Sequence, residues 1–167
     1  MRNMPKTWVI MGVAGCGKSL IGSMLADVLG GVFEDADDFH PPANKEKMTA
    51  RIPLTDEDRW PWLQILRDRI VAQRDQVSCY VLACSALKQS YRDLLRDGED
   101  RETLQFIYLK GSQDLIGSRM AARKGHFMPT TLLDSQFAAL EEPQDALVVD
   151  VGFTPQEIVD DILKQAS

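Results

Sequence analysis

The sequence predicts a three-layer α/β fold, in which helices cover both faces of a five-stranded parallel sheet. Short runs rich in Val, Ile, Leu and aromatic residues alternate with segments of helical period, which is typical of βα units. A glycine-rich loop stands between the first apolar run and an amphipathic helix. The length of 167 residues predicts a single domain over residues 1–167, because domains commonly contain about 100–200 residues.

Five apolar runs have the composition of strands that are buried on both faces of a sheet. Their Val, Ile, Leu and aromatic residues follow one another without regular polar alternation. We assign these runs to strands at residues 7–13, 31–33, 79–84, 104–109 and 146–151.

Apolar residues at helical spacing predict three of the helices. The first helix ends at Gly30, and its buried face is predicted to hold Ile21, Met24, Leu25, Val28 and Leu29. Thr55 and Asp58 have the spacing of a helix N-cap. The helix that they begin can bury Trp62, Ile65, Leu66 and Ile70. The last helix begins at Pro155 and can bury Ile158, Val159, Ile162 and Leu163.

The composition excludes several classes of protein. Nineteen Lys and Arg against 25 Asp and Glu give a net charge of −6, which argues against broad binding of nucleic acid. Apolar runs stay below the roughly 18 residues of a membrane helix, so no membrane partner is expected. Cys16, Cys79 and Cys84 lack metal-ligand spacing, and we interpret them as thiols of a cytoplasmic protein.

The loop after the first strand matches the phosphate-binding motif G-x-x-x-x-G-K-[ST]. Its glycines allow successive N–H groups to point at phosphate oxygens, and the helix N-terminus adds a favourable dipole. Lys18 would bind the β and γ phosphates, and the Ser19 hydroxyl would bind Mg²⁺. The predicted nucleotide-binding residues are Gly12, Val13, Ala14, Gly15, Cys16, Gly17, Lys18, Ser19 and Leu20.

An acidic cluster follows the second strand. Asp35 and Asp37 would point to the same side of an extended segment, next to the phosphate loop, where a metal-bound water and an acceptor hydroxyl need carboxylates. His40 is held stiffly by the two prolines after it. The alternative is a solvated acidic turn with a structural histidine.

Four cations complete the candidate site. Arg59 lies among acidic residues, and Lys88 follows the third strand, where a positive charge suits an anionic substrate. Arg119 and Arg123 are four residues apart on one helical face, which suits stabilisation of a transferring phosphoryl group. Each could instead be an ordinary surface or helix-terminal charge.

Two polar segments leave the carboxyl ends of strands, where ligands bind in parallel α/β folds. These segments, at about 35–62 and around 123–131, are the predicted places for substrate recognition and for a closing lid.

These motifs resemble the gluconokinase family of small P-loop kinases, in family order from about residue 7 to residue 151. The matching strings are Met11-Gly12-Val13, Gly17-Lys18-Ser19, Asp35-Ala36-Asp37-Asp38, His40-Pro41, Asn44, Lys47-Met48, Pro53-Leu54, Asp56, Asp58-Arg59, Pro61-Trp62-Leu63, Cys84-Ser85-Ala86-Leu87-Lys88, Tyr91-Arg92-Asp93 and Gly125-His126-Phe127-Met128-Pro129. The His-Pro, Cys-Ser-Ala-Leu-Lys and Gly-His-Phe strings are the most specific of them.

The resemblance implies strand order 2-3-1-4-5, a substrate-binding segment at about 35–62 and a lid at about 119–135. It also implies ATP and Mg²⁺ as cofactors, D-gluconate phosphorylated at its 6-hydroxyl, and a homodimer. It implies that Asp35 and Ser19 hold the metal and that Asp37 orients or deprotonates the acceptor hydroxyl. The implied gluconate contacts are Asp37, His40, Arg59 and Lys88, and the implied catalytic residues are Lys18, Asp37, Arg119 and Arg123.

The chain departs from the family pattern at Arg51, where such kinases usually carry glycine, and in a shortened spacer at Gln144-Asp145. Arg51 could alter a backbone turn near the substrate.

The alternatives to gluconate phosphorylation are a kinase for another small hydroxy acid, such as shikimate, and a nucleotide-dependent switch protein. A switch is disfavoured because Asn44-Lys45-Glu46-Lys47 lacks the acid of the guanine-binding Asn-Lys-x-Asp.

Overall fold

The protein is described here by a computed structural model, which covers residues 4–122 and 130–167. All strand pairs in its sheet are parallel, and the strand order is β2-β3-β1-β4-β5, as the family resemblance implied. The strands are β1 (Thr7–Met11), β2 (Val32–Asp35), β3 (Tyr80–Ala83), β4 (Leu104–Lys110) and β5 (Leu147–Asp150). The α/β prediction is therefore confirmed, with strand ends shifted by a few residues.

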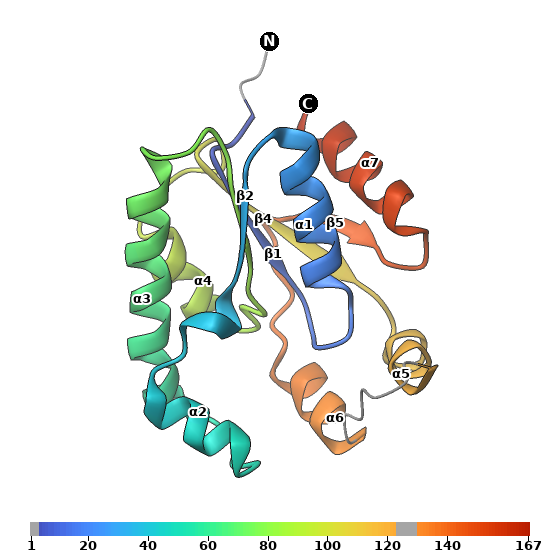
Figure 1. The fold of residues 1–167 in the computed structure, drawn as a ribbon. Coiled ribbons are helices and arrows are strands. Elements are labelled where there is room, and N and C mark those ends of the chain that lie inside the picture. The colour runs from blue at the N-terminus through green and yellow to red at the C-terminus, as the bar shows by residue number, and fades with distance from the viewer. Residues whose placement is uncertain (1–3, 123–129) are drawn as a thin grey trace.

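Helices cover both faces of this sheet (Figure 1). They are α1 (Lys18–Leu29), a 3₁₀ helix η1 (Ala36–Phe39), α2 (Pro42–Thr49), α3 (Asp56–Arg74), α4 (Gln89–Arg96), α5 (Gln113–Ala122), α6 (Thr130–Ala139) and α7 (Pro155–Ala166). α1 and α7 pack on one face, whereas α3 and α4 pack on the other.

The central strand β1 explains the continuous apolar run at the start of the chain. Trp8 and Ile10 belong to the core cluster under α1 and α7, and Val9 and Met11 belong to the cluster under α3 and α4. All four side chains are fully buried. A strand covered on both faces has no solvent-facing side, so both of its alternating sets of side chains are apolar.

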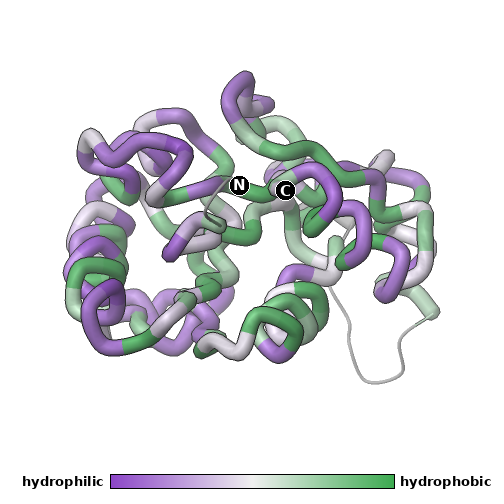
Figure 2. The backbone as a smooth tube through the Cα atoms, turned by 90° about the horizontal axis from the view of Figure 1, so that it is seen from above, coloured by the Kyte–Doolittle hydropathy of each residue, from purple (hydrophilic) through white to green (hydrophobic). Residues whose placement is uncertain are grey.

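The predicted helix faces hold with two exceptions. Ile65 on α3 and Val28 on α1 are 39% and 58% exposed, although both were expected to face the core. Each lies at the edge of its helix's apolar stripe, which here turns toward solvent. Figure 2 shows the general pattern, in which hydrophilic and hydrophobic stretches alternate along the outer helices.

The predicted helix ends are confirmed. Thr55 and Asp58 form a reciprocal capping box at the start of α3, and Thr154 and Glu157 form another at the start of α7. Gly30 ends α1 in the left-handed conformation. Among the described helices, none combines the length and the apolar character that crossing a membrane requires.

Arg51 occupies a backbone position that favours glycine. Its φ is 59°, in the left-handed region. The N–H of Ile52 bonds to the Lys47 carbonyl at 2.8 Å, and the N–H of Arg51 bonds to the Met48 carbonyl at 3.1 Å. This is the Schellman ending of α2, whose left-handed residue is usually glycine. The backbone turn that Arg51 was expected to alter is therefore the one that ends α2.

Candidate active site

The phosphate-binding loop joins β1 to α1. Gly12, Gly15 and Gly17 have φ values of 148°, 80° and 97°, which side-chain-bearing residues rarely adopt. Gly17 is the N-cap of α1, so no side chain blocks an anion there. The loop therefore presents its N–H groups and the positive end of the α1 dipole to one place.

The ammonium group of Lys18 lies over the first half of this loop. Its Nζ donates hydrogen bonds to the carbonyl oxygens of Gly12 and Val13, both at 3.0 Å. Among the described residues, the hydrogen bonds of this ammonium group go to carbonyl oxygens and not to a carboxylate. A phosphate in the loop would therefore meet a cation beside it.

Ser19 and Asp35 bring two oxygen ligands together. The Ser19 hydroxyl donates to Oδ2 of Asp35 at 2.7 Å, across the gap between α1 and the end of β2. A hydroxyl and a carboxylate oxygen fit Mg²⁺, which is bound by few protein oxygens together with phosphate and water. In keeping with such a sparse site, no three metal-binding side chains cluster among the described residues.

Asp37 does not share an extended face with Asp35, as the sequence had suggested. Asp35 is the last residue of β2, whereas Asp37 lies in the helix η1. The N–H of Asp37 instead donates to Oδ1 of Asp35 at 3.0 Å, so Asp35 caps η1. The end of β2 thus positions Asp35, and the 3₁₀ turn, rather than strand alternation, positions Asp37.

His40 faces Asp37 from the end of η1. Its Nε2 lies 3.7 Å from Oδ1 of Asp37, and its buried ring stacks on Trp62 at 4.2 Å. The interaction with His40 is the main reason that the pKa of Asp37 lies below its usual 3.8, and the Lys18 charge adds to it against the opposing effect of burial. Trp62 donates its indole N–H to the Ala36 carbonyl at 2.8 Å, so it is a core residue that supports this pair.

Arg59 and Lys88 come together on a single carboxylate. Nζ of Lys88 lies 3.2 Å from Oδ1 of Asp56, and Nη1 of Arg59 lies 3.7 Å from the same oxygen. The Tyr91 hydroxyl donates to this oxygen as well, and both cations lie less than 6 Å from the centre of the Tyr91 ring. Two cations against one carboxylate leave a net positive charge at this place.

The electrostatics of this cluster stabilise its charged forms. Hydrogen bonds from Tyr91 and then from Lys88 hold the pKa of Asp56 below its usual value. The hydrogen bond to Asp56 in turn raises the pKa of Lys88. Lys88 and Asp56 are therefore both ionised at neutral pH, and the cluster can receive an anion.

A cavity of about 400 Å³ adjoins the phosphate loop on the side of α7. The Arg119 guanidinium donates to the Val151 carbonyl and lies at its wall. The loop between β5 and α7 supplies another part of the wall. The lining residues are Gly15, Cys16, Gly17, Leu20, Arg119, Gly152, Phe153, Thr154, Pro155 and Ile158.

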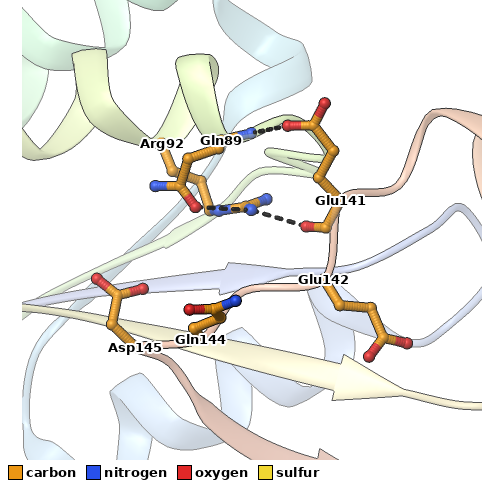
Figure 3. A pocket seen from close by; sticks show the side chains of 6 residues that line it. All are labelled: Gln89, Arg92, Glu141, Glu142, Gln144 and Asp145. Carbon is orange, nitrogen blue, oxygen red and sulfur yellow. Dashed lines mark hydrogen bonds between the residues drawn. The ribbon is translucent and has the colours of Figure 1, made fainter.

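A second cavity, of about 490 Å³, lies where α4 meets the segment after α6 (Figure 3). The buried Arg92 donates to the carbonyls of Ala86 at 2.6 Å and Glu141 at 2.7 Å. The N–H of Gln89 donates to the Glu141 carboxylate at 2.7 Å. These bonds tie the loop that carries Lys88 to the end of α6.

Comparison with known proteins now identifies the chain. A family model described as "Shikimate kinase" matches residues 14–167. The thermoresistant gluconokinase of Escherichia coli K12 is 49% identical over 148 residues, which are 86% of this chain and 83% of that protein. A crystal structure of a gluconokinase from Sinorhizobium meliloti 1021 matches with a TM-score of 0.87 and 41% identity, covering 99% of this chain and 95% of that chain.

The chain belongs to the gluconokinase family. A shikimate kinase from Aquifex aeolicus matches with a TM-score of 0.61 over 95% of this chain and 94% of that chain, but at 13% identity. That likeness shows the shared fold alone. The fold is thus common to several kinases, whereas the sequence similarity is to gluconokinases.

The sequence analysis missed several residues of the site of this gluconokinase family member. Asp56, Asn44 and Tyr91 entered it only as parts of strings that match the family, and the Phe153–Pro155 wall was not found. The spacing of Lys88 and Tyr91, three residues apart at a helix start, could have indicated that they act together. Arg123 and the Gly-His-Phe string lie outside the described residues.

Proposed function

We propose that the protein transfers the γ-phosphoryl group of ATP to the 6-hydroxyl of D-gluconate, forming 6-phospho-D-gluconate and ADP. The observation that carries this proposal is the Arg59–Lys88 cluster, with its net positive charge, on the same edge of the sheet as the phosphate loop and Asp37. A sugar acid has a carboxylate for the cations and a distant hydroxyl for the phosphoryl group. The similarity to gluconokinases at 49% identity supports the same substrate.

ATP would bind with its phosphates in the loop Gly12–Leu20 and its adenine in the cavity beside α7. The cavity supports this placement because it continues directly from Gly15, Cys16 and Gly17. Leu20 and Phe153 offer apolar surface to a base. Lys18 and Arg119, together with Arg123, would stabilise the charge of the transferring group.

Mg²⁺ would be held by Ser19 and by the carboxylate of Asp35, which would also bind its water molecules. When bound, the metal neutralises charge on the β and γ phosphates. The 2.7 Å contact between the two side chains supports this assignment, because both oxygens can face one hard cation.

Asp37 would accept a hydrogen bond from the 6-hydroxyl and aim its oxygen at the γ-phosphorus. A carboxylate whose pKa lies below 3.8 is a weak base at neutral pH. It therefore suits alignment of the hydroxyl better than early removal of its proton. His40, facing the same carboxylate, would hold Asp37 in place and contact the sugar.

The carboxylate of gluconate would bind Arg59 and Lys88. Their shared contact with Asp56 supports this role, since it holds both flexible cations at one point before the substrate arrives. The polar segment 35–62 would thus recognise the substrate, and the segment 119–135 would act as a lid. We further propose a single domain over residues 1–167.

Two properties of the proposed enzyme concern its surroundings. We propose a homodimer, which size-exclusion chromatography with light scattering can test. We also propose a cytoplasmic location, supported by Cys79 and Cys84, which are buried without a disulfide between them. Burial raises the pKa of Cys79 to about 11 and that of Cys84 to about 12, so these two thiols resist oxidation.

The deciding experiment is release of ADP from Mg-ATP by the purified protein, with D-gluconate, shikimate, glucose or no acceptor. Turnover with gluconate alone would support the proposal. Turnover with shikimate alone would favour the second hydroxy-acid kinase, and release that is independent of acceptor would favour a nucleotide switch.

A further inference from the structure

Gln136, on α6, reaches the phosphate-binding loop. Its side-chain oxygen Oε1 accepts a hydrogen bond from the N–H of Ala14 at 2.6 Å, across 122 residues of sequence. α6 lies beside the loop at the carboxyl edge of the sheet (Figure 1). The loop N–H groups are the donors that bind phosphate oxygens, so the amide oxygen of Gln136 uses a donor that a phosphate oxygen can also use.

The position of Ala14 indicates which phosphate is concerned. The N–H of Ala14 belongs to the same peptide group as the Val13 carbonyl, which accepts from Nζ of Lys18 at 3.0 Å. Lys18 in this motif acts on the β and γ phosphates. The two groups of this trans peptide point to opposite sides, but Ala14 lies in the half of the loop that Lys18 contacts. The cavity beside α7 is lined instead by Gly15, Cys16 and Gly17, so Gln136 contacts the loop outside the adenine cavity.

The packing of α6 holds Gln136 in this place. Leu133 is 4% exposed, and Phe137 and Leu140 pack against the core cluster under α1 and α7. The N–H of Glu141 then bonds to the Leu87 carbonyl at 2.8 Å. α6 is thus packed against the core both before and after Gln136. This packing keeps Gln136 within reach of the phosphate-binding loop that follows β1.

A glutamine amide can both accept and donate from one position. Oε1 accepts, Nε2 donates two hydrogens, and rotation about the terminal torsion exchanges them at little cost. When a phosphate oxygen takes the Ala14 N–H, Oε1 loses its partner. Rotation of the amide then presents Nε2–H to that same oxygen.

We propose that Gln136 is a catalytic residue of the phosphoryl transfer, which exchanges its bond to Ala14 for a hydrogen bond to the γ-phosphoryl group. This inference rests on the proposed kinase activity. The amide satisfies the loop before ATP arrives, then adds a donor at the oxygens where charge is spread during transfer. ADP lacks this group, so Gln136 distinguishes ATP from ADP.

The test compares Gln136→Glu, Gln136→Ala and a control, Gln165→Ala. Gln165 donates to the Val148 carbonyl at 3.1 Å on the far end of α7, away from the loop. Dissociation constants are measured by calorimetry for ADP and for the β,γ-imido analogue of ATP, without gluconate, and kcat is measured with gluconate. Thermal melting confirms that each variant is folded.

In Gln136→Glu we expect the Kd of the imido analogue to rise about tenfold or more, because a donor to a charged oxygen becomes a repelling carboxylate. The Kd of ADP should change by less than about threefold. In Gln136→Ala, kcat should fall about tenfold or more, the size expected for a lost bond to a charged group. Gln165→Ala should match the wild type in all three measurements.

Equal weakening of ADP and the imido analogue in Gln136→Glu would overturn the inference, and so would an unchanged kcat in Gln136→Ala. The nucleotide-binding arm does not depend on gluconate. If the wild type fails to phosphorylate gluconate, the proposed function fails, but the binding ratio still reports whether Gln136 contacts the γ-phosphoryl group.

Discussion

The side-chain amide of Asn44 lies 3.2 Å from Nδ1 of His40 and donates its other hydrogen to the Asp58 carbonyl at 2.9 Å. Because this nitrogen can only donate, Nδ1 must accept, and the neutral ring carries its hydrogen on Nε2. Nε2 is the atom that faces Asp37. A buried asparagine on α2 thus sets the tautomer of the histidine in the candidate site.

Asn44→Leu should therefore impair both stability and turnover. The part-buried Asp58 carbonyl and the buried Nδ1 of His40 would lose their donor, at a cost of about 1–3 kcal/mol. The kcat should fall because His40 no longer steadies Asp37. Thermal melting and kcat with gluconate are the measurements. The exposed neighbour Lys45 offers a control, since Lys45→Met should leave both values near wild type.

Lys18→Met should abolish turnover while leaving the fold intact. Within the described parts of the chain its hydrogen bonds go to two loop carbonyls, so its loss breaks no hydrogen bond to a carboxylate there. Its charge is required by the β and γ phosphates. Circular dichroism should match the wild type, and normal turnover in this variant would remove the loop from the mechanism.

Lys88→Met should raise the KM for gluconate about tenfold or more, the effect of losing a bond to a charged group, with little change in the KM for ATP. The reason is that Lys88 lies in the Asp56–Tyr91 cluster rather than in the phosphate loop. Lys164→Met, on the exposed end of α7, is the matched control. Equal changes in both KM values would assign Lys88 to the nucleotide.

Asp37→Asn should lower kcat more than about tenfold. The pH profile of the wild type should show over which pH range the charged form of Asp37 persists. The folded pKa of Asp37 is lowered from 3.8, so its charged form and the stability that it contributes persist above pH 3.8. That contribution is lost only as the pH falls through the lowered value. Between pH 5 and 8, the kcat of the wild type should therefore not fall through protonation of Asp37. A fall in the wild-type kcat toward pH 5 that is missing in Asp37→Asn would contradict this assignment.

Arg51→Gly should stabilise the protein. Relief of the left-handed backbone, with φ of 59°, outweighs the added entropy of glycine in the unfolded chain by about 0.5–1 kcal/mol. The melting temperature should rise by about 1–3 °C. Lys45→Gly, inside α2, should lower it instead. A lower melting temperature for Arg51→Gly would show that its side chain contributes more than the strain costs.

Local sequence signals predicted much of the fold because they act over short distances. The loop Gly12–Ser19, the capping pair Thr55 and Asp58, and the apolar run of β1 each depend on neighbouring residues, and the structure confirms them. The strand order came from family resemblance rather than from such signals. Arg51 was recognised as unusual because glycine is expected there, and its left-handed φ supplies the reason.

Only the tertiary structure decided how the separate motifs meet. The sequence suggested Asp35 and Asp37 as neighbours on a strand, but the 3₁₀ turn after β2 determines their geometry. The sequence could not show that Asp56 joins Arg59 to Lys88, or that Gln136 reaches Ala14. Motifs are encoded by residues close together in the chain, whereas these contacts join residues that the packing of helices on the sheet brings together from distant segments.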